Sequence, residues 1–186
     1  MGHGKKPEGQ TGETRRISRS FRRDYIVFLI LFFALWLFSY LMTKRFPVIL
    51  VQMQLLVAGE LDWCLDKLNY WFTRIDSTFT FHTAHGGERL IVIAECTGLY
   101  TKMIYFSIIG AYPASIKEKL IGLLIGIPAI HILNLLRMIV VSLVLYHKRE
   151  LFGFFHGYFW QVIFVIFMLL LVIFWMAKIV KPRKEA

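Results

Sequence analysis

The chain alternates long apolar runs with shorter polar connections, which is typical of a membrane-spanning helical bundle. Tyr25–Met42 is uncharged over eighteen residues, close to the roughly 20 apolar residues that a bilayer-crossing helix needs. The next apolar run, Leu99–Tyr112, reaches that length only when the residues from Ala94 onward are included. The pattern predicts a mainly α, polytopic membrane helical bundle with about four transmembrane helices, at 25–42, 94–112, 120–146 and 156–177.

The stretch between the first two spans has a different pattern. Val48–Ala58 is apolar but only eleven residues long, which is short for a span. After it, apolar residues recur at helical spacing with polar residues on the other side, and we expect an amphipathic helix on the membrane surface or over the bundle. Val48–Ala58 would lead into this helix, and the sequence leaves open whether it inserts. The apolar face consists of Leu61, Cys64, Leu65, Leu68, Trp71, Phe72 and Ile75.

A β-hairpin is predicted immediately before the second span. Thr78–Phe81 and Arg89–Ile93 are rich in β-forming residues and are separated by a segment that contains Gly86-Gly87. Open strand edges are not tolerated in lipid, so the hairpin must lie in water or against protein. It leads the chain directly to Cys96.

Composition agrees with a membrane protein, and the distribution of charge explains the basic balance. The chain is 57% hydrophobic with seventeen phenylalanines, too apolar for an ordinary soluble domain. Of the net charge of +10, a large part lies in two tails: Met1–Asp24 has seven basic and three acidic residues, and Lys178–Ala186 has four and one. Both tails adjoin apolar spans, which indicates positive-inside anchoring. They form no folded basic face with interleaved aromatics, so we expect the lipid bilayer and no nucleic acid as a partner.

The charge pattern also predicts the orientation of a multi-pass protein in the plasma membrane. Residues 1–24 and 178–186 would be basic cytoplasmic tails, and 25–177 a single transmembrane domain whose insert, 43–95, is extracytoplasmic. If Val48–Ala58 crosses the membrane fully, this parity fails and either the tails or the site change sides.

Under that orientation, three chemically capable residues approach the outer face of the membrane. Cys96 would lie near the outer end of the second span and His156 at the outer start of the fourth. Arg137 would lie in the outer half of the third span, roughly 12 Å below its end at about 1.5 Å per residue.

Cys96 is the candidate nucleophile. It would sit at a helix N-terminus, where the helix dipole favours a thiolate. The amides of Thr97 and Gly98 would be available to an oxyanion, Thr97 to cap the helix or donate to the site, and Gly98 to allow close approach of substrate. The alternatives are a small buried core cysteine or a disulfide with Cys64.

Arg137 and His156 are the other candidate catalytic residues. A guanidinium inside a span is costly and marks function, although an ion pair with Glu95 or snorkelling to the surface would also account for Arg137. Asn134 lies one turn earlier and would orient it, whereas His131 is expected to be a packing or hydrogen-bonding residue. His156 is suited to act as general base and acid, with an interfacial role as the alternative.

A metal site is the less favoured interpretation of the hairpin turn. His82, His85 and Glu88 lie on or beside this turn without a further ligand nearby, and we expect solvated turn residues. The sequence therefore predicts no metal and no cofactor.

Three motifs together resemble the exosortase/archaeosortase family, which comprises polytopic cysteine transpeptidases that act like sortases on a membrane-embedded scaffold. They are Ala94-Glu95-Cys96-Thr97-Gly98-Leu99 after a strand-like lead, Asn134-Leu135-Leu136-Arg137 inside a later span, and His156 opening the next. The resemblance covers roughly Phe79–Trp160. It implies that Cys96 is the nucleophile, Arg137 the essential basic residue and His156 the third member. The family usually has serine at the position of Thr97, and some archaeal members have arginine in place of the last histidine.

The resemblance further implies the substrate. Such enzymes recognise membrane proteins with a C-terminal signal made of a short motif, a transmembrane helix and a basic cluster. Cleavage through an acyl-thioester would pass the protein to an acceptor amine, for example on a lipid, or to water. Two other functions remain open: a non-catalytic scaffold or assembly factor of the same fold, and a small transporter or lipid-binding protein that uses Arg137 as an anion site.

Overall fold

The computed structural model describes residues 9–83 and 86–181, with side chains from Arg22 onward. It is mainly helical, as predicted. The long helices are α1 (Gly9–Arg45), α2 (Pro47–Lys67), α4 (Ile116–His147) and α6 (Trp160–Lys178). The shorter elements are α3 (Leu99–Ala111), α5 (Arg149–Phe154), the 3-10 turn η1 (Ala94–Thr97), the π-helical segment η2 (Phe155–Phe159), and the strands β1 (Phe72–Ile75), β2 (Thr78–Thr83) and β3 (Gly86–Ile91).

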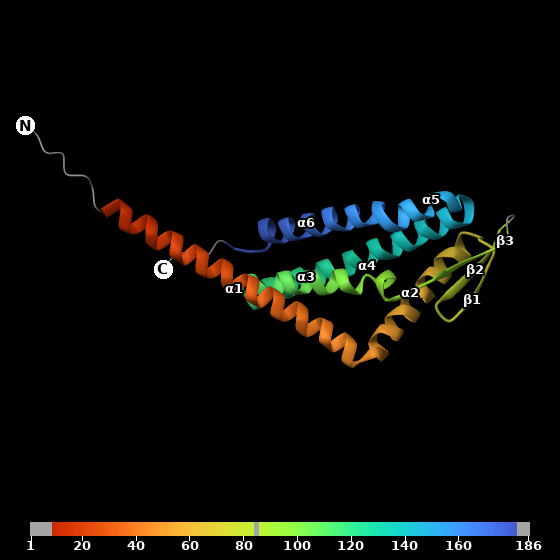
Figure 1. The fold of residues 1–186 in the computed structure, drawn as a ribbon, viewed down its shortest axis with the longest axis horizontal. Coiled ribbons are helices and arrows are strands. Elements are labelled where there is room, and N and C mark those ends of the chain that lie inside the picture. The colour runs from red at the N-terminus through yellow and green to blue at the C-terminus, as the bar shows by residue number, and fades with distance from the viewer. Residues whose placement is uncertain (1–8, 84–85, 182–186) are drawn as a thin grey trace, which may run out of the picture.

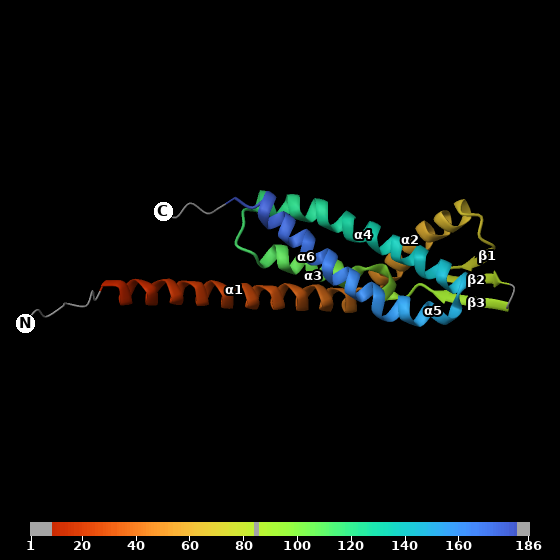
Figure 2. The same cartoon turned by 90° about the horizontal axis from the view of Figure 1, so that it is seen from above.

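The helices form an elongated bundle with the sheet at one end. The N-terminal end of α1 and the C-terminal end of α6 lie at the opposite end, where α1 extends beyond the other helices (Figures 1 and 2). α1 and α2 meet at a bend at Phe46, because Pro47 cannot continue the preceding helix. α3 runs back along α1. α4 packs beside α3 in the opposite direction, and the α5–α6 segment returns antiparallel to α4.

Among the described residues, four helical segments are long and apolar enough to cross a membrane: 22–45, 47–67, 116–147 and 149–178. Three of them correspond to predicted spans, and the fourth, α2, joins Val48–Ala58 to the residues after it in one helix. The prediction of a full second span over 94–112 is wrong in length, because α3 has 13 residues and is only about 20 Å long. Gly98, in the left-handed conformation, separates α3 from η1, and Pro113 follows the end of α3.

The predicted amphipathic helix through residue 75 is wrong beyond Lys67. Asn69 is left-handed, with φ of 56°. Its N–H donates to the carbonyl of Asp66, and the N–H of Tyr70 donates to that of Leu65. This is a Schellman helix stop, in which asparagine takes the place usually held by glycine. The chain then enters β1.

The predicted hairpin is confirmed and has an additional strand. β2 pairs with β3 in antiparallel register, Phe79 opposite Leu90, and β1 pairs with the other edge of β2. The turn residues 84–85 lie outside the described residues. The inner face of the sheet is buried against α2 and α4, in a core that includes Phe79, Phe81, Leu90, Leu61, Leu65, Val141 and Leu145.

Packing in the other half of the bundle depends on small residues. A Cβ at Gly110 would come within 2.7 Å of Leu35, and one at Gly126 would overlap the Tyr105 ring, so α3 lies close to both α1 and α4.

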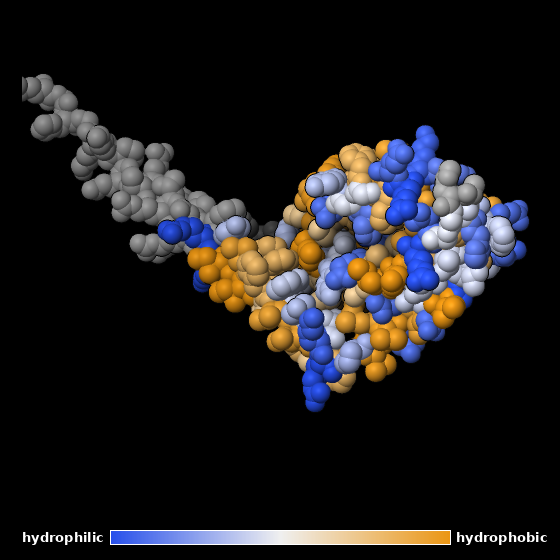
Figure 3. All heavy atoms as spheres, turned by 45° about the vertical axis from the view of Figure 1, so that its right-hand side comes forward, coloured by the Kyte–Doolittle hydropathy of each residue, from blue (hydrophilic) through white to orange (hydrophobic). Residues whose placement is uncertain are grey.

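The surface of the sheet end carries many polar side chains. Figure 3 shows polar side chains gathered over the sheet end and interrupted by apolar patches.

Candidate active site

The candidate nucleophile lies in a short turn, residues 94–98, which we call the reactive turn. The N–H of Cys96 donates to the carbonyl of Ile93 at 2.9 Å. The hydroxyl of Thr97 donates to the carbonyl of Ala94 at 2.7 Å and accepts from the N–H of Leu99 at 3.2 Å. Thr97 therefore ties the turn together and satisfies a free amide at the start of α3.

The reactive turn is held against α4 by Asn134. The side-chain amide of this fully buried asparagine donates to the carbonyl of Cys96 at 2.8 Å. The close packing of the reactive turn against α4 depends on Gly98. Its φ is +66°, and a Cβ at this position would come within 3.0 Å of Asn134. Asn134 was expected to orient Arg137, but its hydrogen bond goes to the reactive turn instead.

Arg137 lies one turn beyond Asn134 on α4. Its guanidinium carbon is 5.9 Å from the ring centroid of Phe164, and it is close enough to interact electrostatically with the Cys96 thiol. Its buried Nε has no hydrogen-bond partner among the described residues. The ion pair with Glu95 that would have explained Arg137 structurally is not formed among those residues.

His156 lies within a helix rather than at the start of one. The expected connection before it is helical, and α5, η2 and α6 follow one another without a break. The imidazole stacks on Phe152, with centroids 5.2 Å apart and planes 7° from parallel, and it lies within electrostatic range of Arg137. Its π-helical segment is a rare conformation that is frequently found at functional sites.

Arg137 and His156 line one cavity of about 510 Å³ between the reactive turn, α3, α4 and the η2–α6 region. Its walls are formed by Glu95, Thr101, Arg137, His156, Gly157, Trp160, Gln161, Phe164 and Val165. Cys96 is only 2% exposed and does not line the cavity, but the preceding residue of the reactive turn, Glu95, does. Arg137 lines the same cavity from α4, the helix whose Asn134 holds the Cys96 carbonyl.

The cavity gathers hydrogen-bonding groups without partners. In the part of the chain that the structure describes, five buried side-chain nitrogen or oxygen atoms have none, and three of these belong to Arg137, His156 and Trp160. Arginine Nε and indole Nε1 can only donate, and imidazole Nδ1 donates in one tautomer. Buried polar groups are normally paired, so the cavity is suited to an acceptor oxygen from outside the chain. Trp160 was missed in the sequence; its spacing of four residues from His156 was the available signal.

A second polar cluster lies on the other side of the reactive turn. Lys102 Nζ donates to His131 Nδ1 at 3.0 Å, and the opposite ring nitrogen of His131 lies 2.8 Å from the carboxylate of Glu60. His131 is thus a hydrogen-bonding residue, as expected. Glu60 and Lys102 were not singled out in the sequence, since they are far from His131 along the chain.

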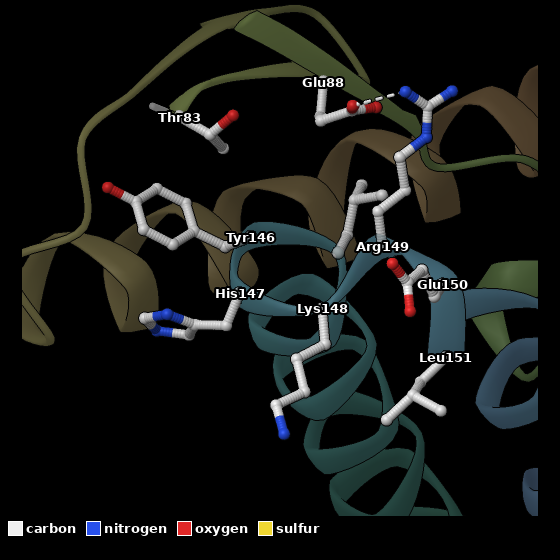
Figure 4. A pocket seen from close by; sticks show the side chains of 9 residues that line it. Thr83, Glu88, Tyr146, His147, Lys148, Arg149, Glu150 and Leu151 are labelled. Atoms are coloured by element: carbon white, nitrogen blue, oxygen red, sulfur yellow. Dashed lines mark hydrogen bonds and ion pairs between the residues drawn. The ribbon is translucent and has the colours of Figure 1, made fainter. Parts of the chain in front are cut away.

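The remaining candidates have ordinary partners. His82 shares a hydrogen bond with Thr73 at 2.8 Å, and His85 lies outside the described residues. Glu88 pairs with Arg149 at 2.8 Å across a pocket of about 680 Å³ near the sheet, where the His147 and Lys148 side chains point away from this pair (Figure 4). Cys64 and Cys96 are both free, so the alternative of a disulfide between them is excluded.

Comparison with known protein families shows to which family the chain belongs. The model of the transmembrane exosortase family (Exosortase_EpsH) matches residues 18–173, which include α2, the sheet, the reactive turn and both cavity-lining helices. Searches of curated proteins and of solved structures find no match. With four apolar helices long enough to cross a bilayer, this is a multi-pass membrane protein, and it belongs to the transmembrane exosortase family.

Proposed function

We propose that the protein is a membrane cysteine transpeptidase or protease that cleaves the C-terminal sorting signal of surface-destined proteins. The observation that carries this proposal is the cavity in which Arg137, His156 and Trp160 present buried polar atoms without partners, beside the reactive turn that bears Cys96. A peptide carbonyl is an acceptor of the kind that such a cavity lacks. Membership of the exosortase family supports the same reaction class.

The residues have distinct roles in this reaction. His156 accepts the thiol proton of Cys96, and the thiolate sulfur attacks the peptide carbonyl carbon. Arg137 stabilises the negative charge on the carbonyl oxygen of the tetrahedral intermediate. His156 then donates its proton to the leaving nitrogen, and the C–N bond breaks to give an acyl-thioester. An acceptor amine, for example on a lipid, or water attacks the thioester and regenerates the thiol.

The supporting residues shape this site. Thr97 fixes the reactive turn because its hydroxyl donates to the Ala94 carbonyl, and Asn134 fixes it because its side-chain amide donates to the Cys96 carbonyl. Gly98 permits the close approach of Asn134. Because Cys96 is covered in the free protein, substrate reaches the thiol from the cavity lined by Arg137 and by Glu95, the neighbour of Cys96.

The orientation is part of the proposal. The basic tails, 1–24 and 178–186, are cytoplasmic, 25–177 is the transmembrane domain, and the insert 43–95 faces outward. In this orientation α2, although long enough to span, does not cross the membrane, and it leads from the end of α1 to the sheet (Figure 1). Support comes from the N-terminal end of α1 and the C-terminal end of α6, which lie at the same end of the bundle, away from the sheet (Figure 2). In the structure α1 extends through the predicted tail to Gly9. The thiol would then reach a bond just outside a substrate's transmembrane helix.

The test is thioester trapping in membranes. The protein is co-expressed with candidate surface proteins that carry a C-terminal helix and basic tail, and wild type is compared with Cys96→Ala, Arg137→Ala and His156→Ala. Cys64→Ala is the matched control. We expect processing to stop in Cys96→Ala, to persist in Cys64→Ala, and a wild-type adduct to be released by hydroxylamine. Equal processing of every candidate without the Cys96 thiol would favour a non-catalytic scaffold.

A further inference from the structure

A continuous chain of polar side chains connects three helices beside the reactive turn. Lys102 comes from α3, His131 from α4 and Glu60 from α2. Lys102 Nζ lies 3.0 Å from His131 Nδ1, and His131 Nε2 lies 3.0 and 2.8 Å from the two carboxylate oxygens of Glu60. All three side chains are partly buried in an otherwise apolar bundle. We call them the Glu60–His131–Lys102 chain.

With Lys102 as an ammonium group, the hydrogen bonds along this chain have one direction. An ammonium group can only donate, so Nδ1 of His131 accepts from Lys102. Nε2 then donates to Glu60, and the opposite charges of Lys102 and Glu60 lie on the two sides of the His131 ring. Charged groups in membrane helices are normally paired in this way.

The lysine end of the chain reaches the reactive turn. Lys102 Nζ makes a long contact of 3.5 Å with the carbonyl of Thr97. The preceding carbonyl, that of Cys96, accepts the hydrogen bond from Asn134. Asn134 lies one turn from His131 on α4, so consecutive carbonyls of the turn contact Asn134 and the lysine end of this chain. The glutamate end lies on α2, which also packs against the inner face of the sheet.

We propose that the Glu60–His131–Lys102 chain positions the turn that bears Cys96 and couples the position of α2 to that of the thiol. This inference rests on the proposed function of Cys96 as nucleophile. None of the three side chains lines the cavity with Arg137 and His156, so they are positioning residues rather than catalytic ones. Without the chain, the turn loosens: the covered thiol becomes more accessible, and its alignment with the peptide carbonyl is lost.

Two substitutions at His131 separate positioning from other roles. Glutamine has a carbonyl oxygen that can accept from Lys102 and an amide that can donate to Glu60, so His131→Gln can preserve the bridge without a titratable group. His131→Leu removes both hydrogen bonds at similar volume. Tyr105→Phe is a matched control, because it removes a single buried hydrogen bond, to the Gly122 carbonyl at 3.0 Å, in the other half of the bundle.

The experiment uses the full chain in a Cys64→Ala background, so that Cys96 is the only thiol. Three quantities are measured: the rate of Cys96 alkylation by iodoacetamide, kcat and KM for processing, and the thermal midpoint. For His131→Leu we expect alkylation to rise and kcat to fall, each about tenfold, with KM little changed. His131→Gln should stay within about threefold of the parent for both rates, and Tyr105→Phe should leave alkylation unchanged.

Three outcomes would overturn the inference. Unchanged alkylation in His131→Leu would show that the turn does not depend on the chain. Equal loss of kcat in His131→Gln and His131→Leu would indicate proton transfer by the imidazole. Equal alkylation in His131→Leu and Tyr105→Phe at matched thermal midpoints would indicate general destabilisation. Failure of the proposed function is distinguishable, because processing would then persist in Cys96→Ala while the alkylation rates still report on the turn.

Discussion

The reactive turn lies between two polar clusters that differ in how completely their hydrogen bonds are formed. On one side, Glu60, His131 and Lys102 bond to one another, and Glu60 Oε2, which accepts no hydrogen bond from the described residues, lies 2.8 Å from His131 Nε2. On the other side, Arg137, His156 and Trp160 line a cavity and leave buried atoms unpaired. An unpaired buried donor or acceptor costs about 1–3 kcal/mol, which makes the second arrangement unfavourable unless a ligand completes it.

The comparison shows that residue type alone does not separate structural from functional polar groups in membrane helices. Each cluster contains a histidine and a long basic side chain. What differs is whether the chain itself supplies the partners. A cluster whose members pair with one another can fix a backbone, whereas one whose donors have no partner in the chain is prepared for a substrate atom.

The largest effect is expected from Arg137 in the unsatisfied cluster. Arg137→Gln should lower kcat/KM for processing about 10²–10³-fold, the usual loss when a donor to a developing oxyanion is removed. Arg137→Lys should recover only part of this, because a lysine ammonium lacks the planar fork of donors. Initial rates of substrate cleavage measure both, with His131→Gln as the control from the satisfied cluster. Equal rates in Arg137→Gln and His131→Gln would remove the distinction between the clusters.

The turn between the clusters should be the next most sensitive point. Gly98→Ala places a side chain at φ of +66° and within 3.0 Å of Asn134. The left-handed conformation alone costs about 1–2 kcal/mol. If the same free energy is lost from the reactive alignment, the processing rate falls roughly tenfold. Cleavage rate and thermal midpoint are measured together, and Gly153→Ala is the control, since a Cβ there meets no neighbour within 4 Å. Similar results for the two variants would show that the close approach is dispensable.

Trp160 should contribute a smaller effect. Trp160→Phe keeps an aromatic ring in the wall of the cavity and removes the indole N–H, a neutral donor. We expect kcat/KM to fall about fivefold to tenfold, in line with about 1 kcal/mol for a neutral hydrogen bond. The smaller ring leaves space in the buried core, so the thermal midpoint should fall as well, but loss of the N–H adds nothing to this because the donor has no partner in the free protein. A lower midpoint with unchanged kinetics would make Trp160 a packing residue only.

The smallest effect is expected for a satisfied group that belongs to neither cluster. Tyr105 is 1% exposed, and its hydroxyl donates to the carbonyl of Gly122 at 3.0 Å. Tyr105→Phe should lower the free energy of unfolding by about 1 kcal/mol and leave processing unchanged. Thermal denaturation in detergent and the cleavage assay measure the two quantities. A large kinetic loss here would mean that hydrogen-bond completeness does not identify functional groups.

Local signals in the sequence predicted much of this arrangement. The β-forming residues of Thr78–Phe81 and Arg89–Ile93, with Gly86-Gly87 between them, predicted the hairpin. The spacing of Asn134 and Arg137 placed both on one side of a helix. β1 was missed because Trp71, Phe72 and Ile75 continue the helical spacing of α2, so the apolar pattern concealed the stop. The signal lay in Asn69, which adopts the left-handed conformation more readily than most residues.

The partners of these residues were harder to predict than their positions. His131 was expected to form hydrogen bonds, but its partners lie 71 and 29 residues away along the chain. Such pairing depends on how the helices pack, and no local pattern encodes it. The unpaired state of Arg137, His156 and Trp160 is likewise a property of the packed bundle. The sequence identified the chemistry of Arg137 and His156 but not the cavity that they share with Trp160.

The π-helical segment at Phe155–Phe159 makes the cavity depend on the number of residues as well as on their identity. Each residue added to an α-helix rotates everything beyond it by about 100°. A π-helical turn holds one residue more than an α-helical turn, so deletion of Gly157 alone would let the segment relax to regular α-helix. His156 and Trp160 would then point in different directions, although neither had been altered. Register, and not only composition, therefore determines which side chains this helix offers to a substrate.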